Sequence, residues 1–218
     1  MYRHGIHKIS LLILALLFVM PASAAETIGW DGLVPPIDES RDPYARLSEP
    51  QQDALYDLWM VRERRAAGST NPDLDNIRAE AVTELEAGGF NADEILSDLD
   101  AFLATLEANK SQVVDSLDGK RIRIPGYVLP TEFVNDKIVE FLLVPYVGAC
   151  VHTPAPPANQ MVYVSVDDGF TSTGLFQPVW VSGKINTELT TQAVDLSDGS
   201  LDVEAGYQIS SAEVVPYE

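Results

Sequence analysis

The spacing of hydrophobic residues along the chain changes near residue 113, and the two spacings predict two kinds of structure. Before that point, apolar residues recur every three or four positions, which is typical of helices with one buried face. Stripes of this kind lie in residues 51–67, 71–89 and 91–111. After that point, apolar residues alternate with polar ones or form short continuous runs, which is typical of strands. The chain is therefore predicted to be an α+β protein.

Residues that commonly begin and end helices bound the three helical stripes. Gly68 follows the first stripe, and Gly88 and Gly89 follow the second. Glycine is the residue most often found just beyond a helix C-terminus. Asn91 begins the third stripe with Glu94 three positions later, the spacing of a capping box. These signals predict two or three helices in an N-terminal helical region.

The strand-like part contains five short segments separated by turn residues. Gly126 and Gly183 each follow a run of β-type residues, where they would relieve bends. Five strands with a long first strand favour a small OB-like β-barrel, and a β-sandwich is the alternative. The segments are "GKRIRIPGYVLP", "KIVEFLLVPYV", "MVYVSVDDG", "PVWVSGKINTE" and "AGYQISSAEVVPY".

The first residues have the order of a secretory signal peptide. A basic start containing Arg3 and Lys8 precedes the apolar run "ISLLILALLFVM", and small residues follow at Ala22 and Ala24. This order is typical of a cleaved signal, and the apolar run is shorter than the ~20 residues that span a bilayer. We therefore expect export, cleavage and no membrane insertion afterwards.

The predicted domain organisation has four parts. Residues 1–24 are the signal peptide, and residues 25–50 are an extended arm with four prolines from Glu26 onward. Trp30, Leu33 and Ile37 are expected to anchor this arm to the body. Residues 51–112 form the helical region, and residues 113–218 form the OB-like β-barrel domain.

The charge of the chain limits its partners. The full chain has 14 basic and 33 acidic residues, a net charge of −19. Removing Arg3 and Lys8 with the signal leaves 12 basic residues and a net charge of −21. Such a chain repels phosphate groups, so nucleic acid and anionic membranes are not expected partners. Cations and basic protein surfaces remain.

The candidate chemistry is concentrated in one proline-rich loop, "GACVHTPAPPANQ", residues 148–160. Its prolines do not fit a central strand or a helix interior, so the loop is predicted to be ordered without secondary structure. Cys150 is the only cysteine, and His152 is the only histidine left after signal cleavage. In an extended segment, residues two apart point to the same face, so the thiolate and imidazole could share a Zn²⁺ or Cu⁺ ion. Glu140 on the preceding strand is the expected third ligand. Glu132 and Asp136 are further oxygen donors, on the hairpin before it.

Other roles for this loop remain open. Cys150 can be a small buried side chain and His152 a hydrogen-bonded loop residue, with Asn159 and Gln160 capping the loop's own backbone groups. The protein would then be a pure protein–protein interaction module. Cys150, His152 and Asn159 also have the residue types of a cysteine-dependent hydrolase. Because the base lies only two residues from the nucleophile on one strand, we expect a protein that is not an enzyme.

Two segments resemble a known bacterial family. "GWDGLVPP" resembles the Trp-x-x-Leu-x-Pro element of the family catalogued as domain of unknown function 3299, and the Cys-x-His-x-Pro-x-Pro-Pro-x-Asn-Gln segment is similar to its loop. Ala155 stands where the family usually has a second proline.

The resemblance implies a periplasmic protein. Members are often encoded beside an export-type ABC transporter and a histidine-rich periplasmic protein linked to zinc supply. The expected role is therefore an accessory protein of a transport system, and the expected partner is an ABC-transporter component or a periplasmic metal-binding protein.

Overall fold

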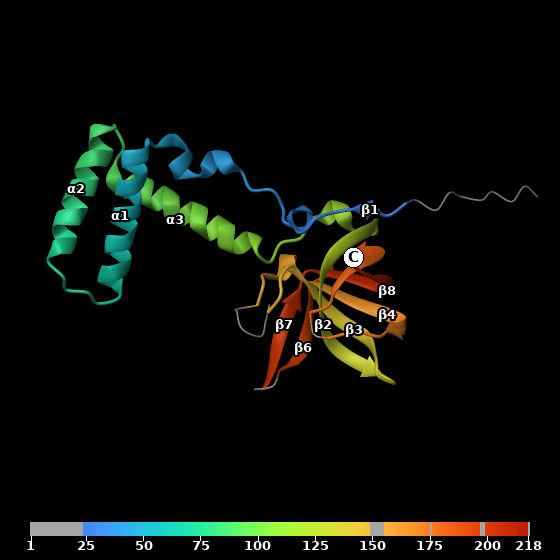
Figure 1. The fold of residues 1–218 in the computed structure, drawn as a ribbon. Coiled ribbons are helices and arrows are strands. Elements are labelled where there is room, and N and C mark those ends of the chain that lie inside the picture. Colours follow the sequence, from blue (N-terminus) through green and yellow to red (C-terminus); the bar gives the residue numbers. More distant parts are fainter. Residues whose placement is uncertain (1–23, 149–154, 175, 197–198, 218) are drawn as a thin grey trace, which may run out of the picture.

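The computed structural model describes residues 24–148, 155–174, 176–196 and 199–217. The predicted signal peptide lies almost wholly outside the described residues, so its cleavage and the export of the protein stay predictions. Within the described part, no helix has both the length and the apolar character needed to cross a membrane. The fold is a mixed α+β architecture, as predicted, with helices and a closed barrel (Figure 1).

Three α-helices form where the hydrophobic stripes predict them: α1 (Glu49–Ala66), α2 (Asp73–Ala87) and α3 (Ala92–Asn109). The Asn91 side chain caps α3 by accepting hydrogen bonds from the backbone N–H groups of Asp93 and Glu94. Gly68 and Gly89 have φ angles of 87° and 85°, the left-handed conformation that glycine adopts without strain. The helices bury a common apolar cluster, and α3 runs from α1 and α2 towards the barrel (Figure 1).

Five strands form the barrel, each in one of the predicted segments: β2 (Arg121–Val134), β3 (Lys137–Val144), β4 (Val162–Phe170), β5 (Pro178–Asn186) and β8 (Tyr207–Pro216). Their order is β2-β3-β4-β8-β5, and β5 pairs back to β2. This pairing closes the sheet, which excludes the β-sandwich alternative. The β4–β8 pair is parallel, and the other barrel pairs are antiparallel.

Two further strands lie outside the barrel and were not predicted. β6 (Thr190–Leu196) and β7 (Gly199–Ala205) form a two-stranded antiparallel hairpin between β5 and β8. Val203 and Ala205 of β7 pack on outward-facing residues of the barrel, among them Leu129 and Leu142. The hairpin therefore covers part of the outer barrel surface. A short strand, β1 (Glu26–Thr27), pairs in parallel with the start of β2.

The arm before the helices is less extended than predicted. It contains three 3₁₀ turns, at Trp30–Leu33, Glu39–Arg41 and Pro43–Arg46. Trp30 and Leu33 anchor it as expected: Leu33 is fully buried in the barrel core, and the Trp30 indole N–H donates to the Pro125 carbonyl at 2.7 Å. Leu33 also presents its carbonyl to the buried Tyr207 hydroxyl at 2.7 Å.

Gly183 lies at a register shift between β5 and β8, which fits the predicted bend, and both Gly126 and Gly183 also meet a second requirement. A Cβ at Gly183 would lie 2.3 Å from Cγ2 of Ile209, and one at Gly126 would lie 2.7 Å from Cγ of Leu143. Both positions therefore require glycine because neighbouring side chains approach the backbone closely.

Candidate functional site

The loop that carries the predicted chemistry is described only at its two ends. Cys150 and His152 lie outside the described residues, so their geometry stays a prediction. The described chain resumes at Ala155 and leads through Pro157 into β4. The residues from Ala155 onward therefore show what surrounds this end of the loop.

The C-terminal part of the loop contains a short helical turn. We expected residues 148–160 to be without secondary structure, and this is wrong for Ala158–Gln160, which form a 3₁₀ turn. The prolines do not oppose it because they come before it. Pro157 is extended, with φ −62° and ψ 157°, and precedes the first residue of the turn.

Hydrogen bonds fix this turn to three separate segments. Asn159 is only 2% exposed, and its amide donates to the Asn109 carbonyl at the end of α3 at 2.7 Å. The Asn159 backbone N–H donates to the Lys110 carbonyl at 3.1 Å. The Gln160 side chain donates to the Trp30 carbonyl, and the Ala158 carbonyl accepts from Gly206 at 2.7 Å. Asn159 and Gln160 were expected to cap backbone groups of the loop itself. Gln160 does so at the Asn159 carbonyl, but the bonds to the Asn109 and Trp30 carbonyls reach other segments.

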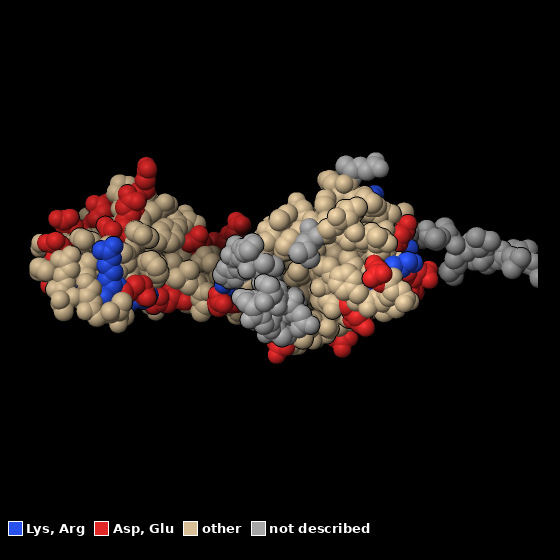
Figure 2. Space-filling view, turned by 60° about the horizontal axis from the view of Figure 1, so that its bottom comes forward, with Lys and Arg blue, Asp and Glu red and all other residues tan. Residues whose placement is uncertain are grey.

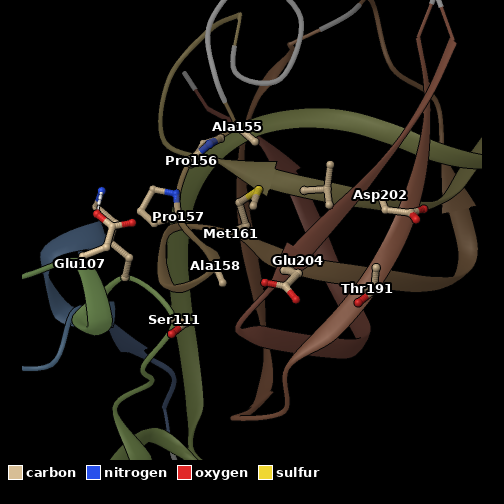
Figure 3. Close-up of a pocket in the computed structure, with 12 residues that line it drawn as sticks. Glu107, Ser111, Ala155, Pro156, Pro157, Ala158, Met161, Thr191, Asp202 and Glu204 are labelled. Atoms are coloured by element: carbon tan, nitrogen blue, oxygen red, sulfur yellow. Dashed lines mark hydrogen bonds and ion pairs between the residues drawn. The ribbon is translucent and has the colours of Figure 1, made fainter. Parts of the chain in front are cut away.

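A cleft of about 690 Å³ opens beside this turn. Its walls come from the end of α3, from residues 155–161 and from the β6–β7 hairpin, and Figure 3 shows Glu107 on one side with Asp202 and Glu204 on the other. The lining residues are Glu107, Lys110, Ser111, Ala155, Pro156, Pro157, Ala158, Met161, Thr191, Asp202, Val203 and Glu204.

The cleft has an excess of negative charge. The Lys110 ammonium pairs with the Glu107 carboxylate at 2.5 Å, so these two charges largely offset each other. Asp202 and Glu204 form no ion pair with any Lys or Arg of the described residues. The hairpin wall therefore offers two uncompensated carboxylates to a ligand. Among the charged side chains on the face shown in Figure 2, acidic ones are more common than basic ones.

Glu140, the predicted third metal ligand, lies half-buried on β3 and pairs in register with Glu132 of β2 and Ser165 of β4. The Tyr163 hydroxyl donates a hydrogen bond to the Glu140 carboxylate. Burial raises the pKa of Tyr163 well above its usual range, and this hydrogen bond to Glu140 raises it further. The phenol therefore stays protonated and keeps Glu140 as its acceptor.

Among the described residues, no three His, Cys, Asp or Glu side chains gather as a metal-binding group. Glu132 is exposed, and Asp136 lies in the tight turn between β2 and β3 with a φ of 62°. Glu132 therefore lies opposite Glu140 across the β2–β3 pair, but no third His, Cys, Asp or Glu of the described residues joins these two carboxylates.

Sequence reasoning missed the acidic wall of the cleft. Asp202 and Glu204 lie on β7 in the segment "LDVEA", where apolar and acidic residues alternate. This period of two is a strand signal, and it places Val203 towards the barrel and its neighbours outwards. The alternation was available in the sequence, but the position of this hairpin beside α3 was not.

Comparison with known proteins adds a family match. A family model described as "Protein of unknown function (DUF3299)" matches residues 30–216. The chain is also similar to the crystal structure of a DUF3299 family protein from Pseudomonas aeruginosa PAO1. The two are 28% identical, the match covers 89% of this chain and 97% of that chain, and the TM-score is 0.47. No curated protein matches the chain.

Proposed function

Since the chain belongs to the DUF3299 family, whose function is unknown, we propose from its own residues that it is an exported, non-enzymatic accessory protein that binds a cationic ligand. The observation that carries this proposal is the acidic cleft lined by Ala155–Ala158, which follow Cys150 and His152 in the chain. The order of basic, apolar and small residues in 1–24 supports export to the periplasm. The proposed setting is a transport system, with an ABC-transporter component or a periplasmic metal-binding protein as partner.

The walls of the cleft support binding because they are held rigid before a ligand arrives. Asn159 and Ala158 are tied by hydrogen bonds to α3 and to Gly206 just before β8, and Pro156 and Pro157 restrict the backbone that leads into them. A rigid site loses little conformational entropy on binding. Asp202 and Glu204 supply the negative charge that favours a cation over an anion.

A metal ion is the first candidate ligand. Cys150 and His152 would supply a thiolate and an imidazole, which suit Zn²⁺ or Cu⁺, and Glu140 would supply an oxygen. Zinc sites use about four ligands, at least three of them from protein, so this set predicts weak binding. Glu140 would have to share its carboxylate with Tyr163. Asp202 and Glu204 line the same cleft as Ala155, which makes them the competing oxygen donors.

A pure interaction module is the second candidate, and the exposed apolar residues before the loop favour it. Tyr146 and Val147 are 44% and 61% exposed, directly after β3. With the acidic hairpin wall, they would suit a partner surface that is basic with an apolar centre. In this case the Cys150–His152 loop is structural.

Hydrolase activity is the least supported role. Asn159 would have to orient His152, but its amide is buried and donates to the Asn109 carbonyl at 2.7 Å. Turning it towards a histidine would leave that buried carbonyl without its donor, which costs about 1–3 kcal/mol.

We also propose that the barrel is of the OB type. Its strand order supports this assignment. The third barrel strand, β4, pairs in parallel with the last, β8, and the first, β2, closes the barrel on the fourth, β5. In OB barrels, ligands bind at one face and at the loops around it. The β6–β7 hairpin would then be an elaborated loop that forms one wall of the cleft.

Calorimetric titration with Zn²⁺ tests the metal-binding proposal. We expect the wild type to bind weakly, Cys150→Ser and His152→Ala to lose binding, and either Glu140→Gln or Glu204→Gln to weaken it. Glu80→Gln on the exposed face of α2 makes the same charge change and should bind like the wild type. Affinity should fall as the pH drops through the imidazole pKa of about 6.5. Zn²⁺ binding that is equal or negligible in the wild type and all variants would contradict the metal site. The interaction module would then be the favoured function.

A further inference from the structure

A second pocket, of about 260 Å³, lies where β2 and β5 meet the C-terminal end of the chain. It shares no residue with the acidic cleft. None of its lining side chains is charged, and three of them are aromatic. They are Trp30, Pro125, Gly126, Tyr127, Pro145, Pro178 and Tyr217.

Two contacts hold the Trp30 side chain in place at one wall of the pocket. The indole N–H donates to the Pro125 carbonyl at 2.7 Å, which fixes the edge of the ring. The ring lies so close to the β2 backbone that a Cβ at Gly126 would come within 2.9 Å of its Cζ2 atom. Glycine at 126 therefore makes room for Trp30. The Trp30 side chain lines this second pocket and not the acidic cleft.

The Tyr217 wall is also positioned by two contacts. Its backbone N–H donates to the Pro178 carbonyl at 3.0 Å. Its ring stacks on Trp180, with centroids 5.2 Å apart and planes inclined by 21°. The side chain is nonetheless 50% exposed, so its free face is open to a ligand.

The lining chemistry selects for a small group that needs few hydrogen bonds. The carbonyls of Pro125 and Pro178 already accept hydrogen bonds from the protein. Aromatic faces attract cations through their π electrons, and cages of such rings recognise quaternary ammonium groups. The pocket is smaller than the roughly 300–1,000 Å³ clefts that hold drug-sized ligands.

The neighbouring residues show the same interaction already in use. The Arg123 guanidinium lies 4.3 Å from the centre of the Trp180 ring, on which Tyr217 stacks. The net charge of −19 also raises the local concentration of cations over anions.

We propose that the pocket lined by Trp30, Tyr127 and Tyr217 binds a quaternary ammonium group of the trimethylammonium type. Trp30 and Tyr217 provide aromatic side chains held by the contacts described above, and Tyr127, Pro145 and Pro178 add further uncharged lining. This site is independent of the acidic cleft and of any metal ion. A free small molecule or a lipid head group could carry the same cation.

Titration with choline, followed by saturation-transfer NMR of its methyl protons, tests the proposal. The matched probe is 3,3-dimethyl-1-butanol, which has the same shape with a neutral carbon in place of nitrogen. We expect choline to bind, and the neutral probe to bind at least about fivefold more weakly. Tyr217→Leu keeps an apolar side chain but removes one aromatic face, so we expect choline affinity to fall about two- to fivefold.

Tyr56→Leu, on the exposed side of α1, is the control and should bind choline like the wild type. Phosphatidylcholine vesicles in a parallel arm identify the source. Co-sedimentation that Tyr217→Leu weakens indicates a lipid head group, and choline binding without co-sedimentation indicates a free ligand. Three results would overturn the proposal: no binding of choline, equal binding of choline and the neutral probe, or tighter binding of the uncharged ligand N-acetylproline amide than of choline. So would unchanged choline affinity in a folded Tyr217→Leu variant.

Discussion

The helices and the barrel are stabilised in different ways, and the difference shows where the binding groups lie. The helices share an apolar cluster, and exposed ion pairs such as Arg62–Asp100 and Arg65–Asp75 link their surfaces. The barrel encloses a larger core built from strands far apart in the chain. Both pockets proposed to bind ligands are built mainly from the barrel and its attached segments, and α3 contributes only its last turn and the residues after it. The helices therefore brace one wall of a site whose other walls belong to the barrel.

The largest effect should come from removing a barrel core side chain. Phe141 is fully buried and meets Phe170 edge to face, with ring centroids 5.5 Å apart. We expect Phe141→Ala to lower the free energy of unfolding by about 3–5 kcal/mol, because it leaves a cavity among strands that cannot collapse into it. Phe141→Leu keeps most of the volume and should cost about 1.5 kcal/mol or less. Urea denaturation monitored by circular dichroism measures both, and equal costs would contradict this account of the barrel core.

Adding one methyl group to the barrel should have the next largest effect. A Cβ at Gly183 would overlap Ile209, so we expect Gly183→Ala to cost about 1–3 kcal/mol. Gly174→Ala is the matched control because nothing lies within 4 Å of its Cβ position. A Gly183→Ala variant as stable as Gly174→Ala would show that Ile209 can move aside at little cost.

The Tyr163–Glu140 contact predicts a smaller effect that depends on pH. Burial, and then the hydrogen bond to Glu140, raise the pKa of Tyr163 above its unfolded value. The stability from this shift is therefore fully present below the unfolded pKa of about 10 and is lost as the pH rises above it. Ultraviolet titration of ionised tyrosine should show a late-titrating group that is absent in Tyr163→Phe. We expect Tyr163→Phe to cost about 0.5–1.5 kcal/mol at pH 7. An unchanged titration curve would contradict the contact.

The smallest effect should come from the surface of the helices. Arg62 and Asp100 pair through two hydrogen bonds, but their side chains are 37% and 48% exposed. We expect Arg62→Ala to cost less than about 1 kcal/mol, because solvent and salt screen such pairs. The hydrogen bond from Arg62 holds the pKa of Asp100 below its usual range, so this contribution is present above the unfolded pKa and lost as the pH falls below it. A cost that is the same at pH 2 or in 1 M NaCl would show that packing, rather than charge, is responsible.

Sequence patterns predicted the elements better than they predicted the site. Local signals such as the Asn91 cap and the glycines after α1 and α2 located the helices, because a helix is specified within its own segment. The five barrel strands followed from alternation and turns. The β6–β7 hairpin was missed because its strands are short and rich in polar residues; of its described side chains, Val203 and Ala205 are the buried apolar ones.

The candidate site depends on contacts between distant segments, which a single sequence does not reveal. The cleft exists because Asn159 joins α3, and because β7 lies beside residues 155–161. Cys150 and His152 lie outside the described residues, so their predicted role has not been tested by the structure. Glu140 was correctly placed on β3, but its hydrogen bond with Tyr163 of β4 could not be predicted.

Mapping of backbone amide shifts by NMR during Zn²⁺ addition tests the central claim most directly. If the acidic cleft is the binding site, the amide signals of Ala155, Ala158, Val203 and Glu204 should move in proportion to bound metal. Signals of α1 and α2 should stay unchanged, and the shifts should disappear in Cys150→Ser. Shifts confined to residues outside the cleft, or no shifts at all, would contradict the claim.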